Sequence, residues 1–163
     1  MNKLQYDSFY KFLVSVGIIL ITAPIISIYY YFTGTDDILI TQEEFAQLLY
    51  RSLYPYSTAD NMYEELAQRG IISEHEKKPT TYVTRQQAAQ YVVRMLGYGD
   101  LLAYPELFNY PYRDNCDELY RGAVAISGTL GLLEADADGN FAAEQNITQG
   151  ETFELIVRTI KQK

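Results

Sequence analysis

The residues that could carry acid–base or metal chemistry are few in this chain and lie far apart. The single histidine, His75, lies in a charged segment where no serine or cysteine partner is indicated, which favours a solvated residue over a catalytic base. The single cysteine, Cys116, provides neither a disulfide framework nor a zinc site. Adjacent acids such as Glu64 and Glu65 face different directions on a helix, as in a solvated surface. We therefore predict a protein that is not an enzyme and needs no cofactor.

One acidic segment could bind calcium. Acidic residues alternate from Glu134 to Asp138 and precede Gly139, as in the first half of an EF-hand loop. Counted from Glu134, however, the twelfth position is Gln145 instead of the bidentate glutamate that closes such a loop. We interpret the segment as an Asp-Gly turn and predict no metal site, with a weak ion site as the open alternative.

The elements that would position any site begin at three similar segments. Thr41, Thr84 and Thr148 each follow an aliphatic residue and precede a Glu or Gln by three positions. The aliphatic residues are Ile40, Val83 and Ile147, and the third residues are Glu44, Gln87 and Glu151. This is a capping box, in which the threonine and the third residue satisfy backbone N–H groups at a helix start. Three helices that begin in the same way are predicted.

The same register continues along each helix. Apolar residues recur seven, eight and twelve positions after each threonine, a spacing that gives one apolar helix face. They are Leu48, Leu49 and Leu53; Tyr91, Val92 and Leu96; and Leu155, Ile156 and Ile160. Ten positions after each threonine stands an arginine (Arg51, Arg94, Arg158), where a cation suits the helix C-terminus. The economical explanation is a sequence repeat.

Between the repeats, further elements are expected. Residues 57–60 offer caps for a helix that runs to about Arg69, and 114–117 offer caps for a helix through about Leu130. Gly122 and Gly128 in the second of these suggest close packing against a neighbouring helix. Residues 97–111, rich in Tyr, Gly and Pro, are interpreted as a long connection or insertion.

The helix starts, taken with the segments before them, resemble the S-layer homology (SLH) repeat of bacterial surface proteins. The resemblance rests on an aliphatic-Thr-Arg-x-Glu/Gln start, preceded by a helix that ends in Gly and two aliphatic residues. Those preceding segments are Arg69-Gly70-Ile71-Ile72 and Gly131-Leu132-Leu133, the latter followed by Asp138-Gly139-Asn140-Phe141. The similarity extends from Asp36 to the C-terminus, with repeats at about 36–54, 57–97 and 112–161. The first is a half repeat without its opening helix.

The resemblance implies three repeats around a central helical bundle, with grooves that bind secondary cell-wall polymer, often bearing pyruvate ketals. It also implies that the Arg after the cap threonine is a main polymer contact. Only Arg85, beside Thr84, matches that position, whereas Gln42 and Gln149 stand there in the other repeats without charge. These four residues are the predicted polymer-binding residues. A guanidinium fork at a helix N-terminus suits a carboxylate, and we expect the Arg85 side chain to be free of the cap.

The N-terminal region is interpreted separately. Phe12 to Phe32 holds no charged residue and is long enough to cross a bilayer as a helix. Lys3 and Lys11 precede it and acidic residues follow it, which predicts a cytoplasmic N-terminus and a signal anchor. The predicted domains are a cytoplasmic tail (1–11), a transmembrane signal anchor (12–32) and an extracytoplasmic SLH-like domain (36–163). The predicted fold class is all-α: an N-terminal transmembrane helix followed by a helical SLH-like repeat domain of five or six helices.

Charge and repeats together suggest the function. The net charge of −8 argues against nucleic acid as a partner. We expect a single-pass cell-surface protein in the cell membrane, whose SLH-like domain binds secondary cell-wall polymer and tethers the membrane or a membrane complex to the wall. The alternative is a scaffold subunit that contacts another envelope protein through a Tyr-rich surface, without polymer binding.

Overall fold

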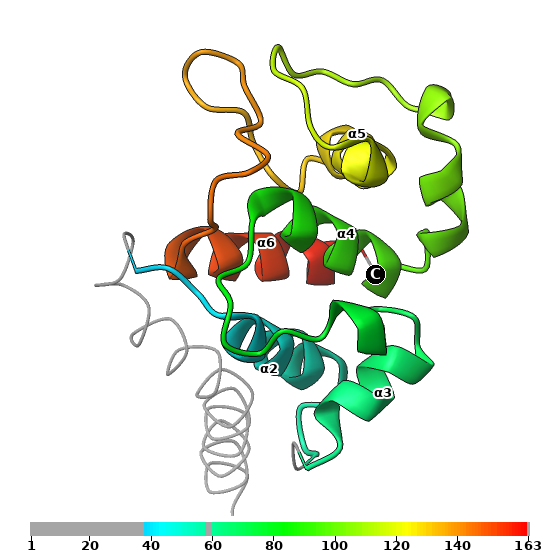
Figure 1. The fold of residues 1–163 in the computed structure, drawn as a ribbon, viewed down its shortest axis with the longest axis vertical. Helices are drawn as coiled ribbons and strands as arrows, with labels where there is room; N and C mark the ends of the chain where they lie inside the picture. Colours follow the sequence, from blue (N-terminus) through cyan, green and yellow to red (C-terminus); the bar gives the residue numbers. More distant parts are fainter. Residues whose placement is uncertain (1–37, 58–59, 163) are drawn as a thin grey trace, which may run out of the picture. The chain divides into compact units, whose positions relative to one another are not determined.

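The computed structural model describes residues 38–57 and 60–162 (Figure 1). The chain divides into two compact units, residues 1–36 and 37–163, and the first lies outside the described residues. The α-helices of the second unit are α2 (Gln42–Leu53), α3 (Met62–Gln68), α4 (Arg85–Met95), α5 (Arg121–Thr129) and α6 (Gln149–Lys161). Short 3-10 helices are η1 (Glu74–Glu76), η2 (Gly99–Ala103), η3 (Pro105–Leu107) and η4 (Glu118–Tyr120).

The predicted fold class needs correction. Its helical part is confirmed, since the described residues form helices and three isolated β-bridges but no β-strand. Its transmembrane helix is not found in the part of the chain that the structure describes, where no helix is long and apolar enough to cross a membrane. The stretch to which the transmembrane helix was assigned, Phe12 to Phe32, lies outside the described residues.

The three predicted helix starts are confirmed. Thr41, Thr84 and Thr148 are the N-caps of α2, α4 and α6, and a full capping box is present at each. In each box the threonine hydroxyl accepts the N–H of the third helical residue, and that residue's side chain accepts the threonine N–H. The repeat arginines lie in the last turn of each helix, as predicted.

The segments before these helices are joined in a ring of backbone hydrogen bonds. Ile40 N–H donates to the Ile147 carbonyl (3.4 Å), Ile147 N–H to Val83 (2.8 Å), and Val83 N–H back to Ile40 (3.1 Å). The first N–H of each helix also donates to a neighbouring repeat: Gln42 to Thr81 (2.8 Å), Arg85 to Gln145 (2.8 Å) and Gln149 to Ile38 (2.7 Å). Donors that a helix cannot satisfy internally therefore join the repeats. As a result, the first helical residue of each repeat lies at a junction between two repeats.

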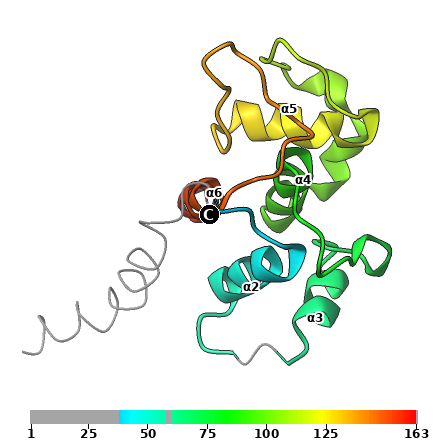
Figure 2. The ribbon, with the colours of Figure 1, turned by 60° about the vertical axis from the view of Figure 1, so that its left-hand side comes forward.

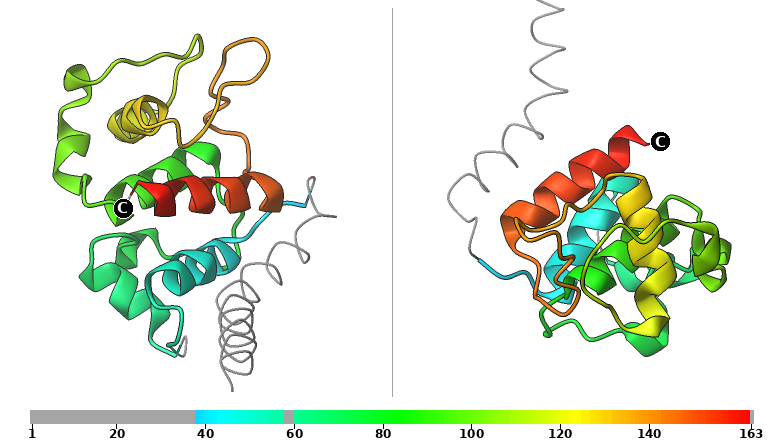
Figure 3. Two further views of the ribbon diagram at one scale, coloured as in Figure 1. Left: turned by 180° about the vertical axis from the view of Figure 1, so that it is seen from behind. Right: turned by 90° about the horizontal axis from the view of Figure 1, so that it is seen from above.

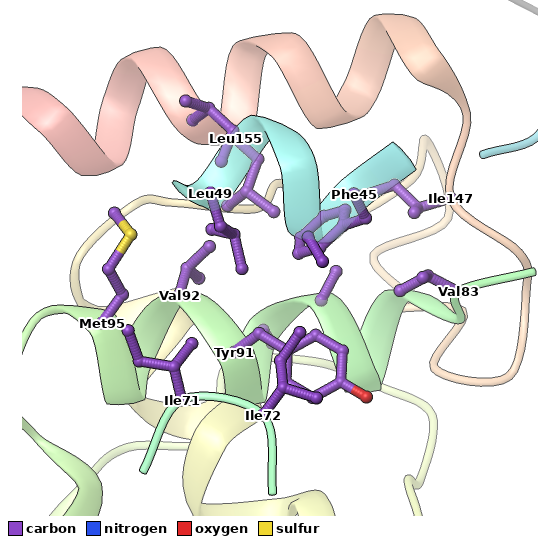
Figure 4. Close-up of a cluster of buried hydrophobic side chains, with 14 of the residues drawn as sticks. Phe45, Leu49, Ile71, Ile72, Val83, Tyr91, Val92, Met95, Ile147 and Leu155 are labelled. Atoms are coloured by element: carbon purple, nitrogen blue, oxygen red, sulfur yellow. The ribbon is translucent and has the colours of Figure 1, made fainter. Parts of the chain in front are cut away.

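The core lies where α2, α4 and α6 face one another. Figure 4 shows Leu49, Val92 and Leu155 pointing toward each other from these three helices, and all three are fully buried. Their positions, seven or eight residues after the cap threonine, are those predicted for the apolar face. The twelfth position follows the prediction less well, because Ile160 is 49% exposed on α6.

The opening helices α3 and α5 end as the resemblance implied. Gly70 and Gly131 have φ values of +68° and +63°, which favour glycine, and the next residues are buried aliphatics. Ile71 N–H donates to Leu66 and Leu132 N–H to Ser127, both at 2.9 Å, which completes the C-terminal cap. The predicted start of α3 is wrong. Its N-cap is Asn61, which makes no side-chain capping bond, instead of a residue within 57–60.

The connection after α4 packs against α5 at two glycines of α5, Gly122 and Gly128. A Cβ atom at Gly122 would lie 2.4 Å from the carbonyl oxygen of Leu102 in η2, and one at Gly128 would lie 2.8 Å from the hydroxyl oxygen of Tyr112. The predicted close packing is therefore confirmed, although the neighbours are a 3-10 helix and a loop. Asp117 caps η4, which leads directly into α5.

The helices are arranged around α4 and α6. Figure 2 shows α5 lying against α4, and these two helices are in contact. Figure 3 shows α6 running beside α2 and α4, with which it is also in contact. The starts of α4 and α6 are thereby placed next to the long segment between α5 and α6, where the candidate site lies.

Candidate ligand-binding pocket at a junction between repeats

The predicted site residues lie at different junctions. Arg85 is the first residue of α4 and faces the third repeat, whereas Gln42 is the first residue of α2 and faces the second. Both are buried, with 7% and 3% exposure. Gln149, at the start of α6, is partly exposed, and the Thr84 hydroxyl is used in its own helix cap. The structure therefore does not bring the four predicted residues into one site.

Arg85 is bonded within the protein. Its Nε donates to the carbonyl of Phe141 (2.8 Å), one Nη to the carbonyl of Glu134 (2.7 Å), and the other Nη pairs with the Glu151 carboxylate. Its guanidinium also lies 5.2 Å from the centre of the Phe141 ring. The Arg85 side chain takes no part in the cap of its own helix, which Thr84 and Gln87 form, but it pairs with Glu151, a member of the Thr148 capping box.

A pocket of about 350 Å³ opens beside Arg85. Its walls come from the start of α4, the segment after α5, the loop before α6 and one face of α6. The lining residues are Arg85, Leu132, Leu133, Glu134, Ala135, Asp136, Phe141, Ala142, Gln145, Glu151, Glu154 and Arg158. The pocket therefore lies between the second and third repeats, where the resemblance implies a ligand groove.

The mouth of the pocket is charged. Arg158 on α6 pairs with Glu134 (2.8 Å) and with Glu154 (3.4 Å), so two carboxylates share one guanidinium. Both carboxylates are largely exposed, whereas Arg158 is about one-third exposed. The pocket thus presents exposed hydrogen-bond acceptors beside fixed N–H donors.

One wall is a turn built on Asp136. Its Oδ1 accepts the N–H groups of Asp138 and Asn140, both at 2.9 Å, and Gly139 has a φ of +84°. These backbone bonds hold the pKa of Asp136 below its ordinary value. The predicted Asp-Gly turn is confirmed. Within the described part of the chain, no group of three His, Cys, Asp or Glu side chains is placed to hold a metal ion.

Asp114 fixes the opposite wall, a role that sequence reasoning missed. Its carboxylate accepts the N–H groups of Phe141 (2.6 Å) and Ala142 (2.8 Å), where Ala142 has a φ of +56° that is unusual for a residue other than glycine. The Phe141 carbonyl is thereby held where Arg85 reaches it. The sequence suggested only a helix cap at Asp114, and no local signal indicates a contact 27 residues away.

The Gln42 junction is closed by hydrogen bonds of the Gln42 side chain. The Gln42 amide donates to the carbonyl of Glu76 (2.7 Å) and the hydroxyl of Tyr91 (3.0 Å), and accepts the N–H of Lys78 (2.5 Å). Burial raises the pKa of Tyr91 to about 12, so its hydroxyl stays protonated at neutral pH. Glu76 pairs with Arg94 at 2.8 Å, and this holds the loop in place. The Gln42 amide thus binds the loop of the second repeat through both its nitrogen and its oxygen.

The repeat arginines distinguish complete repeats from the half repeat. Arg94 bonds Glu76 and Arg158 bonds Glu134, so each reaches back to the loop before its own helix. Arg51 occupies the same position in the first repeat, whose preceding segment lies outside the described residues, and is exposed. These contacts were not predicted, since the sequence suggested only a favourable interaction with the helix dipole.

Comparison with known proteins gives no match: no protein-family model matches the chain, and no curated protein or solved structure is significantly similar to it. The pocket is the feature of the described residues that bears on function. Its walls offer hydrogen-bond donors and acceptors at fixed positions, and the groups around Arg85 are already bonded to one another. Such an arrangement suits the binding of a hydroxyl-rich ligand more than the activation of a nucleophile.

Proposed function

We propose that the helical unit of residues 37–163 is a non-catalytic binding module for a secondary cell-wall polymer, and that a saccharide segment of the polymer binds at the Arg85 junction. The observation that carries the proposal is the pocket of about 350 Å³ between two repeats, lined by guanidinium and carboxylate groups. This volume lies within the range of small-ligand pockets. Sugar hydroxyls both donate and accept hydrogen bonds, so they match a wall of this kind.

Arg85 has a positioning role in this proposal. Its donors go to Phe141, Glu134 and Glu151, which are three separate parts of the pocket wall. In this proposal the ligand contacts the exposed groups at the mouth of the pocket, Glu154 and Arg158. The polymer contact that the SLH resemblance assigns to Arg85 is thus replaced here by a structural bond to Glu151.

The repeat architecture supports the choice of ligand class. Capping boxes at Thr41, Thr84 and Thr148 and the glycine ends of α3 and α5 follow the pattern that resembles SLH repeats. In that family the grooves between repeats bind wall polymer, and the pocket found here lies between two repeats. Gln42 and Gln149 are not assigned to the site in this proposal.

Sedimentation with cell-wall sacculi tests the proposal. The purified full-length chain should pellet with sacculi, and acid extraction of secondary polymer from the same sacculi should abolish pelleting. The double variant Glu154→Gln/Arg158→Gln should pellet less than the wild type, whereas Glu64→Gln, an exposed substitution on α3, should behave as the wild type. Equal pelleting before and after extraction would contradict polymer binding.

A scaffold function is the second candidate, and one observation favours it. Tyr104, Leu107 and Leu119 are 52%, 67% and 68% exposed in the segments that flank α5. Large exposed apolar side chains are typical of surfaces that contact another protein. Failure to pellet with any sacculi, together with co-purification of a protein that Leu107→Ser/Leu119→Ser releases, would favour this candidate.

A further inference from the structure

The charge balance of the pocket indicates which saccharide it would accept. Four carboxylates and two guanidiniums line the pocket, an excess of two negative charges. The carboxylates are Glu134, Asp136, Glu151 and Glu154, and the guanidiniums are Arg85 and Arg158. The whole chain is also acidic, with a net charge of −8, which adds to the negative potential at the pocket.

Both guanidiniums are already neutralised. Arg85 pairs with Glu151 and donates its other bonds to two carbonyls, while Arg158 pairs with Glu134 and Glu154. An anionic ligand group would have to displace one of these carboxylates and would then lie beside it. The anionic group and the displaced carboxylate would repel each other, and this repulsion is stronger where the site is partly shielded from water.

The excess negative charge lies at the exposed side of the pocket. Glu134 and Glu154 share the single charge of Arg158, and the Asp136 carboxylate accepts hydrogen bonds from N–H groups of its own turn. Those N–H bonds keep Asp136 ionised at neutral pH. A cationic donor at the mouth would therefore meet carboxylate oxygens with unused acceptor capacity.

We infer that the saccharide unit recognised at the Arg85 junction carries a free ammonium group, which lies against Glu134, Asp136 and Glu154 while the sugar hydroxyls contact Arg158. This inference rests on the proposed polymer-binding function and specifies its ligand. It differs from the expectation of a pyruvylated polymer, which would bring a carboxylate to a pocket that is already acidic.

The test compares ligands that differ only in the charge of the amine. The full-length chain is titrated calorimetrically with a glucosamine tetrasaccharide, with the N-acetylglucosamine tetrasaccharide, and with wall polymer before and after chemical N-acetylation. The free amine should bind at least about tenfold more tightly than its acetylated form, as expected for a charge-assisted hydrogen bond, and acetylation should weaken the polymer similarly. Added salt should reduce the difference.

Variants locate the effect. Glu134→Gln/Glu154→Gln removes the excess charge and should bring the ratio of the two affinities close to one, whereas Glu64→Gln removes an exposed charge on α3 and should leave it unchanged. The ratio is the decisive quantity, because loss of folding would weaken both ligands equally. A ratio near one in the wild type, or tighter binding of the acetylated polymer or of an oligogalacturonate, would overturn the inference while polymer binding stands. Absence of binding to the polymer in either form would overturn both.

Discussion

The Gln42 junction and the Arg85 junction share one backbone design and differ in how they are filled. In both, the first helical N–H donates to a carbonyl of the next repeat, Thr81 or Gln145, three residues before the next cap threonine. At the first, the short Gln42 amide bonds Glu76 and Lys78. At the second, the longer Arg85 side chain bonds three segments of the pocket wall, and the pocket lies beside it. The two junctions thus share their backbone bonds and differ in the side chain at the helix start and in the loop that it bonds.

Loop length contributes to the difference. Thr84 comes fourteen positions after Gly70, whereas Thr148 comes seventeen positions after Gly131. The longer segment contains the Asp136 turn and is held by Asp114. Residues of this longer segment line the pocket beside Arg85.

The largest effect is expected from removing the side chain that spans the open junction. Arg85→Ala should lower the free energy of unfolding by about 3 kcal/mol, because it breaks a largely buried ion pair and two bonds to carbonyls. Urea denaturation of the full-length chain measures this. Arg85→Lys is the matched control and should recover only part of the loss, since lysine lacks the planar fork. An unchanged midpoint for Arg85→Ala would contradict the positioning role.

A smaller loss is expected at the Gln42 junction. Gln42→Ala should cost about 2 kcal/mol, because the buried N–H of Lys78 and the carbonyl of Glu76 lose their partner. Gln149→Ala, at the corresponding but partly exposed position of α6, serves as the control and should have little effect. If the two variants were equally stable, the two junctions would not differ as described.

The helix caps should behave alike, because they belong to the shared frame. Thr41→Ala, Thr84→Ala and Thr148→Ala should each cost about 1 kcal/mol, since each leaves helix N–H groups without an acceptor. Thermal unfolding followed by circular dichroism measures the three losses. Three unchanged melting temperatures would show that the caps do not support the repeats.

The smallest expected effect is a pH dependence confined to the Gln42 junction. Burial opposes ionisation of Glu76, but hydrogen bonds from Arg94 and Ser73 outweigh it and hold its pKa below the ordinary value of 4.5. Ionised Glu76 therefore stabilises the fold above pH 4.5, and this contribution is lost as the pH falls through the lowered pKa. Between pH 5 and about pH 3, Glu76→Gln should lose less urea resistance than the wild type. Parallel losses in the two proteins would contradict the assignment.

Local sequence patterns predicted the frame well. The capping boxes, the apolar positions of Leu49, Val92 and Leu155, and the glycine ends at Gly70 and Gly131 depend on residues within one or two helical turns. Such interactions are visible in spacing alone. The three helices were therefore placed almost to the residue.

The site was predicted only in part, because its contacts are long-range. Arg85 was correctly placed at a groove between repeats, but its bond to Glu151, 66 residues away, could not be seen in spacing. Asp114 was interpreted as a helix cap, although its acceptors bond Phe141 and Ala142. Arg158 was assigned to the helix dipole, although it also bonds Glu134. In each case a polar side chain with a plausible local role was used for a tertiary contact instead.

The central claim is that ligand binds at the Arg85 junction and not at the Gln42 junction. Backbone amide NMR spectra of the full-length chain, recorded as purified wall polymer is added, test it most directly. Amides of residues 132–136, 141–145 and 151–158, which contain the pocket lining beyond Arg85, should shift together. Those of residues 76–81, which carry the loop at Gln42, should stay in place. Shifts centred on 76–81, or no shifts at saturating polymer, would contradict the account.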